Sequence, residues 1–219
     1  MTKTKTLIIG DVHGKWESYF DLVNQSGVSQ TIQIGDFGVG FGGGNSVREN
    51  RLTQWMTENP TNRFIRGNHD GPEACQKMPG YIDDGMVEND VMFIGGAWSI
   101  DGPGGPWDAH RLQGHDWWYD EECTESAFAT CQDIYASTKP RVMITHDCPS
   151  TVSKRMFFDT GIITGDIHRT RTGEALQRML DIHRPELWIF GHWHNSTQFE
   201  MDGTKFVCLD ELDAMIVDL

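Results

Sequence analysis

Short apolar runs alternate with helical stripes along this 219-residue chain, and several runs end directly in glycine, aspartate, asparagine or histidine. Such runs are typical of buried strands, and apolar residues three and four apart indicate helices. The predicted strands span residues 6–9, 31–34, 64–66, 91–94, 142–145 and 187–190, and the stripes fall within 16–23, 52–56, 128–135 and 176–180. Strands that alternate with helices predict an α/β fold.

The pattern changes beyond Gly191. Strand-like runs at 197–201 and 205–209 flank the turn Asp202-Gly203, and another follows at 214–217, which predicts a hairpin and a further strand. Two segments show neither pattern, namely Gly38–Gly44 and Asp101–Tyr119. We expect both to be functional loops, because long loops in a compact domain are more often functional than not.

Composition narrows the possible partners. A formal net charge of −14 argues against extended nucleic acid and against anionic membranes, since both require a basic face. No linker or charge block divides the chain, so we expect one domain over residues 1–219. Five cysteines without CxxC spacing, and no signal-peptide pattern, predict free thiols and a cytoplasmic protein. The sequence leaves the oligomeric state open.

Metal-capable side chains follow five of the predicted strands. The five clusters are Gly10-Asp11-Val12-His13-Gly14, Gly35-Asp36, Arg66-Gly67-Asn68-His69-Asp70, His146 and Gly191-His192-Trp193-His194. Ligands of open α/β sheets bind at the carboxyl ends of the strands, so clusters far apart in sequence can converge in space there. A single residue of this kind is more often a cap or a turn former, whereas five clusters together favour a metal site.

The residue types indicate which metals fit. Asp11 and His13 lie two apart on an extended segment, so both side chains project to one side, and His192 and His194 have the same relation. Imidazole, carboxylate and carboxamide ligands suit Mn²⁺, Fe, Zn²⁺, Co²⁺ or Ni²⁺ better than Mg²⁺ or Ca²⁺. The candidates are Asp11, His13, Asp36, Asn68, His146, His192 and His194. Seven ligands are too many for one ion and suit two, with Asp36 as the bridge.

The order GDVHG, GD, RGNHD, a lone His146 and GHWH resembles the calcineurin-like metallophosphoesterase superfamily. That resemblance implies a four-layer αββα sandwich, an α/β fold of two mixed β-sheets flanked by helices. It also implies two divalent metal ions, for which we favour Mn²⁺. It assigns Asp11, His13, Asp36 and His194 to one metal, and Asp36, Asn68, His146 and His192 to the other.

The motif forms are most similar to the serine/threonine phosphatase branch and its phage and bacterial members. That branch continues its second motif as GDxVDRG, in which the arginine contacts phosphate, whereas this chain reads GDFGVGFGGG and has no arginine there. The segment GGAWSID resembles that of small prokaryotic and phage members. Neither similarity names a substrate.

The resemblance implies hydrolysis of a phosphate ester by a hydroxide that bridges the two metals. It assigns His69 to protonating the leaving oxygen and Asp70 to orienting His69. We expect Arg66 to hold phosphoryl oxygens, because a guanidinium matches their geometry, and Arg111 is a second candidate for this contact.

A phosphomonoesterase acting on a small molecule, nucleotide or phosphoprotein is our first interpretation. The first alternative is a phosphodiesterase acting on cyclic nucleotides or short nucleic acid, because the same metal pair serves both bond types in this superfamily. A second alternative is a non-catalytic binding module that retains the fold. Degenerate members of that kind usually lose ligands, whereas this chain retains all seven and His69.

Overall fold

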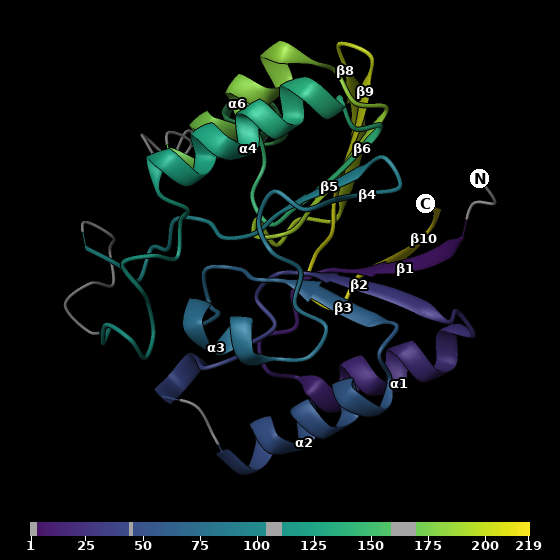
Figure 1. Ribbon diagram of the computed structural model, residues 1–219, viewed down its shortest axis with the longest axis vertical. Coiled ribbons are helices and arrows are strands. Elements are labelled where there is room, and N and C mark those ends of the chain that lie inside the picture. The colour runs from purple at the N-terminus through teal and green to yellow at the C-terminus, as the bar shows by residue number, and fades with distance from the viewer. Residues whose placement is uncertain (1–3, 44–45, 104–110, 159–169) are drawn as a thin grey trace.

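The computed structural model describes residues 4–43, 46–103, 111–158 and 170–219. Two mixed β-sheets pack face to face, and helices cover the outer face of each sheet (Figure 1). This arrangement is the αββα sandwich that the family resemblance implied. Gly44 and residues 104–110, which belong to the two predicted loops, lie outside the described residues.

The first sheet has the strand order β10-β1-β2-β3. Its strands are β1 (Lys5–Ile9), β2 (Gln30–Ile34), β3 (Asn62–Ile65) and β10 (Ala214–Asp218). The first three are parallel, and β10 pairs antiparallel with β1, so strands near the two ends of the chain lie side by side at one edge (Figure 1). The helices α1 (Trp16–Ser26), α2 (Ser46–Glu58) and α3 (Pro72–Lys77) lie on the outer side of this sheet.

The second sheet has the order β4-β5-β6-β7-β9-β8. Its strands are β4 (Val87–Glu88), β5 (Val91–Ile94), β6 (Val142–Thr145), β7 (Leu187–Phe190), β8 (Thr197–Met201) and β9 (Thr204–Cys208). The strands β5, β6, β7 and β9 are parallel, while β4 and β8 pair antiparallel at the two edges. Helices α4 (Glu125–Thr138) and α6 (Arg171–Ile182) cover its outer face, and α5 (Ser150–Phe158) contacts α6.

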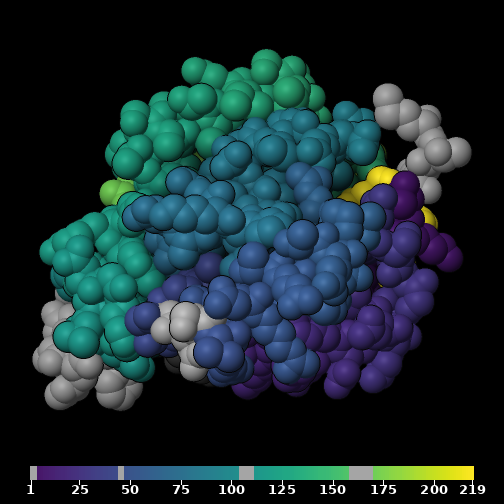
Figure 2. All heavy atoms as spheres, turned by 60° about the horizontal axis from the view of Figure 1, so that its bottom comes forward, coloured from purple at the N-terminus to yellow at the C-terminus, as the bar shows by residue number. Residues whose placement is uncertain are grey.

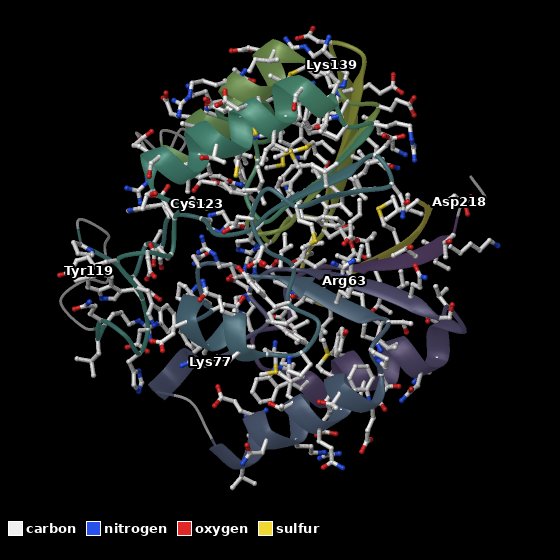
Figure 3. The ribbon with its side chains drawn as sticks, viewed as in Figure 1. Arg63, Lys77, Tyr119, Cys123, Lys139 and Asp218 are labelled. Atoms are coloured by element: carbon white, nitrogen blue, oxygen red, sulfur yellow. The ribbon has the colours of Figure 1, made fainter. Side chains whose placement is uncertain are left out.

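The segment that leads into α4 forms a lobe at the lower left of the space-filling view (Figure 2). Tyr119 lies on this lobe away from the sheets, and Cys123 lies where the chain returns to them (Figure 3). The side chains of this lobe differ in exposure: Tyr119 is exposed to solvent, whereas Asp101 and Trp117 are buried. The predicted loop is therefore packed onto the molecule at both of its described ends.

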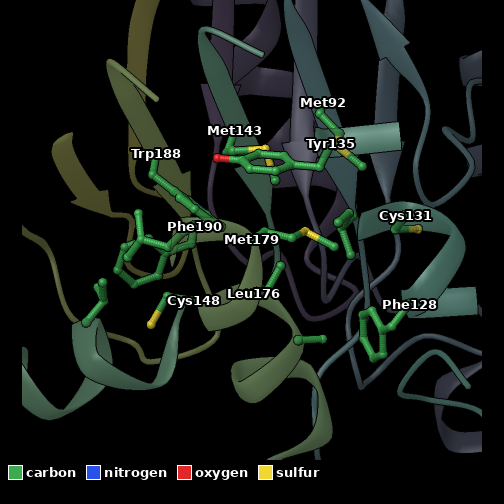
Figure 4. Close-up of a cluster of buried hydrophobic side chains, with 14 of the residues drawn as sticks. Met92, Phe128, Cys131, Tyr135, Met143, Cys148, Leu176, Met179, Trp188 and Phe190 are labelled. Atoms are coloured by element: carbon green, nitrogen blue, oxygen red, sulfur yellow. The ribbon is translucent and has the colours of Figure 1, made fainter. Parts of the chain in front are cut away.

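Three apolar clusters hold the layers together. One fills the space between the sheets with β-branched residues such as Ile34, Ile144 and Ile189. The second joins the β4–β9 sheet to α4 and α6, where Trp188 and Tyr135 are fully buried (Figure 4). The third lies under α1, α2 and α3. Because the strands are buried on both faces, they are continuous apolar runs, which is the pattern that predicted them.

Four short elements are absent from the sequence-based prediction, among them the three-residue 3-10 helix η1 (Phe41–Gly43) within the predicted loop Gly38–Gly44. Strand β4 has two residues and α3 has six, so neither produces a periodic signal, and α5 carries no regular apolar stripe. All five cysteines are buried free thiols. No helix within the described residues is long and apolar enough to span a membrane.

We expect Ile144→Ala to destabilise the fold by about 2–5 kcal/mol, because Ile144 is fully buried between the sheets and its truncation leaves a cavity. The matched control is Ile216→Ala on β10, where the side chain is 52% exposed, and it should change the free energy of unfolding by less than about 0.5 kcal/mol. Urea unfolding of both variants measures the difference. Equal effects would contradict the assignment of the inter-sheet core.

Candidate metal centre

The candidate ligands converge where strands of both sheets end. Asp11, Asp36 and Asn68 follow β1, β2 and β3, whereas His146 and His192 follow β6 and β7. Since each set of strands is parallel within its sheet, their carboxyl ends lie at one edge. Face-to-face packing of the sheets then brings the two edges together, and the side chains meet there.

One group of four side chains contains Asp11, His13, Asp36 and His194, whose ligand atoms lie within 4.8 Å of one another. The Nε2 atoms of His13 and His194 are 3.1 Å apart. Asp11 Oδ2 lies 3.3 Å from His194 Nε2 and 3.8 Å from His13 Nε2. Asp11 and Asp36 are buried, while His194 is 47% exposed, so this group opens to solvent on one side.

A second group contains Asp36, His146 and His192, again within 4.8 Å. His146 Nε2 lies 3.3 Å from Asp36 Oδ1 and 3.1 Å from Asn68 Oδ1. The rings of His146 and His192 meet edge to face with centroids 5.2 Å apart. All four side chains named for the second metal therefore lie together, and Asp36 belongs to both groups.

The chemistry of these atoms fits cations. His146 Nδ1 lies 2.9 Å from the carbonyl oxygen of Ile34, so in the neutral ring, the form that binds a metal, Nδ1 donates and Nε2 carries a lone pair. That lone pair faces two oxygens, from Asp36 and Asn68. Asp11 Oδ2 is buried without a hydrogen-bond partner among the described residues. A positive ion satisfies all of these lone pairs at once, as hydrogen bonds among these groups cannot.

Burial and charge shift the pKa values of the site in opposite directions. Burial raises the pKa of Asp11 well above its ordinary value. Burial also acts to raise the pKa of Asp36, but the positive charge of His146 and its neighbours outweighs it and brings that pKa well below the ordinary range. Burial lowers the pKa of His192 to about 3. Although burial opposes it, the Asp36 carboxylate raises the pKa of His146 to about 10.

The backbone of the site is strained. His13, Asp36, His192 and His194 all have positive φ, between 46° and 65°. This region is disfavoured for residues with a Cβ, and it persists where the surroundings determine it. Gly35 also has positive φ, and a Cβ there would overlap the His146 ring. The conformation thus turns the candidate ligands inward, at a cost in backbone energy.

Asp70 lies beside the site but does not contact the His69 side chain. Its two carboxylate oxygens accept four backbone N–H groups, from Phe37, Gly38, Val39 and Gly67. The carboxylate therefore holds the segment after Asp36 against the segment after β3. These contacts give Asp70 a different role from the orientation of His69 that the resemblance implied.

Arg66 is not brought into the site. Its five N–H donors all have acceptors: Asp84 accepts two, the carbonyl oxygens of Asp120 and Glu121 accept one each, and Cys123 accepts one. No donor remains for a phosphoryl oxygen, which removes the basis for the predicted phosphate contact. Arg66 instead ties β3 to the start of α4.

His69 and Arg111 lie close together through a residue that the sequence did not single out. Asp101 Oδ2 is 3.9 Å from His69 Nδ1, and Asp101 Oδ1 accepts a hydrogen bond from Arg111 Nε at 3.2 Å. The His69 ring lies 5.4 Å from that of His13, at the border of the first ligand group. The sequence signals for Asp101 are its position in a segment that resembles neither strand nor helix and its place as the last residue of GGAWSID, and neither gave it a role.

The comparisons with known proteins agree with this geometry. The calcineurin-like phosphoesterase family model matches residues 4–196, so the chain belongs to this family. No curated protein sequence matches the chain.

Among solved structures, a putative 5′-nucleotidase from Staphylococcus aureus is similar at a TM-score of 0.55 and 12% identity, over 98% of this chain and 51% of the other. The chain thus spans about half the length of that protein. The phosphopantetheinyl hydrolase of Mycobacterium tuberculosis aligns over 96% of this chain and 90% of its own, at a TM-score of 0.49 and 13% identity. The likeness to the first structure shows a shared fold.

We expect divalent metal binding to release at least about one proton per protein at pH 7, because a His146 with a pKa of about 10 is protonated there and must lose that proton to become a ligand, and the raised pKa of Asp11 can only add to the release. The proton competes below the raised pKa, so affinity should rise with pH, by up to about tenfold per unit between pH 7 and 9. Calorimetric Zn²⁺ titrations in two buffers of different ionisation enthalpy measure the release. Binding without proton release would contradict the assignment.

Asp70→Asn should destabilise the fold by about 2–3 kcal/mol, because an amide nitrogen then faces backbone N–H groups that the carboxylate accepts. Asp21→Asn on the exposed face of α1 is the matched control and should change stability by less than about 0.5 kcal/mol. Thermal unfolding of the metal-free proteins measures both. An unchanged Tm in Asp70→Asn would show that the four contacts contribute little.

Proposed function

We propose that this chain is a phosphomonoesterase that uses two divalent metal ions. The position of Asp36 is the observation that carries the proposal. Its Oδ2 lies 3.8 Å from His13 Nε2 in the first ligand group, and its Oδ1 lies 3.3 Å from His146 Nε2 in the second. One buried carboxylate with an oxygen toward each group is what a shared ligand requires.

The proposed ligands are those that the family resemblance assigned. Asp11, His13, Asp36 and His194 would hold one ion, and Asp36, Asn68, His146 and His192 the other. When bound, the ions supply Lewis acidity toward phosphoryl oxygens and lower the pKa of water. The mixture of imidazole and oxygen donors suits Mn²⁺, Fe, Zn²⁺, Ni²⁺ or Co²⁺, with Mn²⁺ as our first choice.

His69 is the proposed general acid. A water oxygen forms the new bond to phosphorus, the bond from phosphorus to the alcohol oxygen breaks, and the alcohol oxygen takes a proton from His69 Nε2. One proton of the water leaves with the phosphate, and the other is released to solvent, from which His69 is reprotonated. The products are inorganic phosphate and an alcohol. His69 borders the first ligand group through its contact with the His13 ring, and its backbone N–H donates to Asp36 Oδ1 at 2.7 Å. The shared carboxylate thus also fixes the acid.

Two arginines at the rim support a dianionic monoester as substrate. Arg111 is 42% exposed and is joined to the His69 side of the site through Asp101. Arg48 lines a small pocket of about 170 Å³ together with His13, Phe41 and Glu49. A phosphomonoester carries more negative charge on its phosphoryl group than a diester does, so it gains more from cations placed there.

The test is turnover by metal-stripped protein after addition of Mn²⁺, Ni²⁺, Zn²⁺ or Mg²⁺, with 4-nitrophenyl phosphate and bis(4-nitrophenyl) phosphate as substrates. We expect activity only with added metal, and a higher kcat/KM for the monoester. A preference for the diester would overturn the monoesterase assignment and leave a metal-dependent phosphodiesterase. No turnover with any of the metals and either substrate would overturn the catalytic proposal.

His69→Ala should lower kcat for phenyl phosphate by about 10²–10⁴-fold, because its leaving group needs a proton, and by much less for 4-nitrophenyl phosphate. Elemental analysis should find the same metal content as in the unmodified protein, since His69 is outside both ligand groups. The matched control is His183→Ala, because His183 packs against the Tyr135 ring and contacts the Pro140 carbonyl oxygen, and it belongs to neither ligand group. Equal loss in both variants would remove His69 from the mechanism.

A further inference from the structure

One ring nitrogen of the proposed general acid has no hydrogen-bond partner among the described residues. His69 Nδ1 is buried and forms no hydrogen bond within the part of the chain that the structure describes. Leaving a buried ring nitrogen unsatisfied is costly. The neighbouring groups include the Phe41 ring, whose centroid lies 4.8 Å from that of the His69 ring, and the carboxylate of Asp101. Asp101 is the one of these that can accept a hydrogen bond.

We propose that Asp101 is the positioning residue of His69: its carboxylate accepts the Nδ1–H of His69 and thereby directs Nε2 toward the leaving oxygen. This inference rests on the proposed function of His69 as general acid. The 3.9 Å separation of the two atoms exceeds a hydrogen bond, but catalytic hydrogen bonds are often long before substrate binds and shorten in the complex. The distance requires only a small movement of either side chain.

Asp101 is itself held in place. Its side chain is 4% exposed, and its backbone N–H donates to the hydroxyl of Ser99 at 3.1 Å. The backbone N–H of Ser99 in turn donates to Glu121 Oε1 at 2.7 Å. The Arg111 guanidinium binds the other carboxylate oxygen. These contacts fix the backbone of Asp101 and occupy its Oδ1. The position of Oδ2 is therefore defined, and this oxygen remains available to His69.

The adjacent carboxylate cannot take this role. Both oxygens of Asp70 already accept backbone N–H groups, two each. Rotating Asp70 toward His69 would break these four bonds. Asp70, which is next to His69 in sequence, is therefore fully used by backbone N–H groups. Asp101, which is far from His69 in sequence, is the carboxylate that faces its ring.

The contact with Arg111 determines what an isosteric substitution does. In Asp101→Asn, the carbonyl oxygen of the amide must face Arg111 Nε, because that nitrogen can only donate. The amide NH₂ group then faces His69 Nδ1 and acts as a donor toward it. The substitution therefore removes the acceptor for Nδ1–H, and with it the contact that holds the ring with hydrogen on both nitrogens, which is the form that donates from Nε2 while keeping hydrogen on Nδ1.

Kinetics of Asp101→Asn test the proposal, with Asp116→Asn as the matched control. Asp116 is an acidic residue of the same segment that pairs with His115 and the Leu112 N–H. We expect Asp101→Asn to lower kcat for phenyl phosphate by about tenfold or more, a part of the effect of a positioned acid, and to leave kcat for 4-nitrophenyl phosphate within about threefold. KM should stay within about twofold for both substrates. Asp116→Asn should leave kcat and KM for both substrates within about twofold of the unmodified protein.

A spectroscopic measurement separates this proposal from the proposed function. In ¹⁵N-labelled, Zn²⁺-loaded protein, the His69 ring signals are assigned by their loss in His69→Gln. We expect hydrogen on Nδ1 in the unmodified protein and its loss from Nδ1 in Asp101→Asn. If no substrate is turned over, the proposed function fails while this measurement still decides whether Asp101 binds His69.

Three results would overturn the inference. An equal fall in kcat for both substrates, with lost metal or a lower Tm, would show a structural role for Asp101. A raised KM with unchanged kcat would show that Asp101 acts through Arg111 on substrate binding. An Nδ1 signal that is the same in the unmodified protein and in Asp101→Asn would show that the two residues do not bind.

Discussion

The carboxylate of Asp36 is the constraint on which the site depends. It is buried, so its charge is stable only beside positive groups, and imidazoles from both sheets surround it. Two side chains that contact it, His13 and His146, belong to different ligand groups. Any movement of Asp36 therefore alters both groups together, and through the His69 backbone N–H it alters the position of the proposed acid as well.

The position of Asp36 depends in turn on the packing of the two sheets. His146 follows β6 of the second sheet, while the carbonyl oxygen that accepts its Nδ1–H belongs to Ile34 at the end of β2 in the first. This hydrogen bond crosses the interface directly above the β-branched core. A slip of one sheet past the other would break it. The apolar interface thus sets the geometry of the polar site, although none of its side chains takes part in the chemistry.

Much of the architecture could be predicted because its signals are local. A run such as Val142–Thr145 is buried on both faces and therefore apolar throughout, and the residue after it is placed at the strand end whatever the rest of the fold does. The short β4 and α3 cannot be predicted in this way, because segments of two and six residues are too short to show a hydrophobic period. The types and positions of the ligands are likewise local, and their convergence follows from parallel strands.

The roles of the remaining polar residues depend on contacts that no motif contains. Arg66 follows the end of a strand, as the candidate ligands do. It nevertheless binds Asp84 and the carbonyl oxygens of residues 120 and 121, so its role depends on residues that are far from it in sequence. Asp70 is next to His69 in sequence but faces backbone N–H groups, whereas Asp101 comes from another loop and faces the ring. Successive side chains after a strand point in different directions, so adjacency to a catalytic residue is weak evidence of contact with it. The carboxylate that contacts a proposed acid can therefore be identified only from the three-dimensional structure.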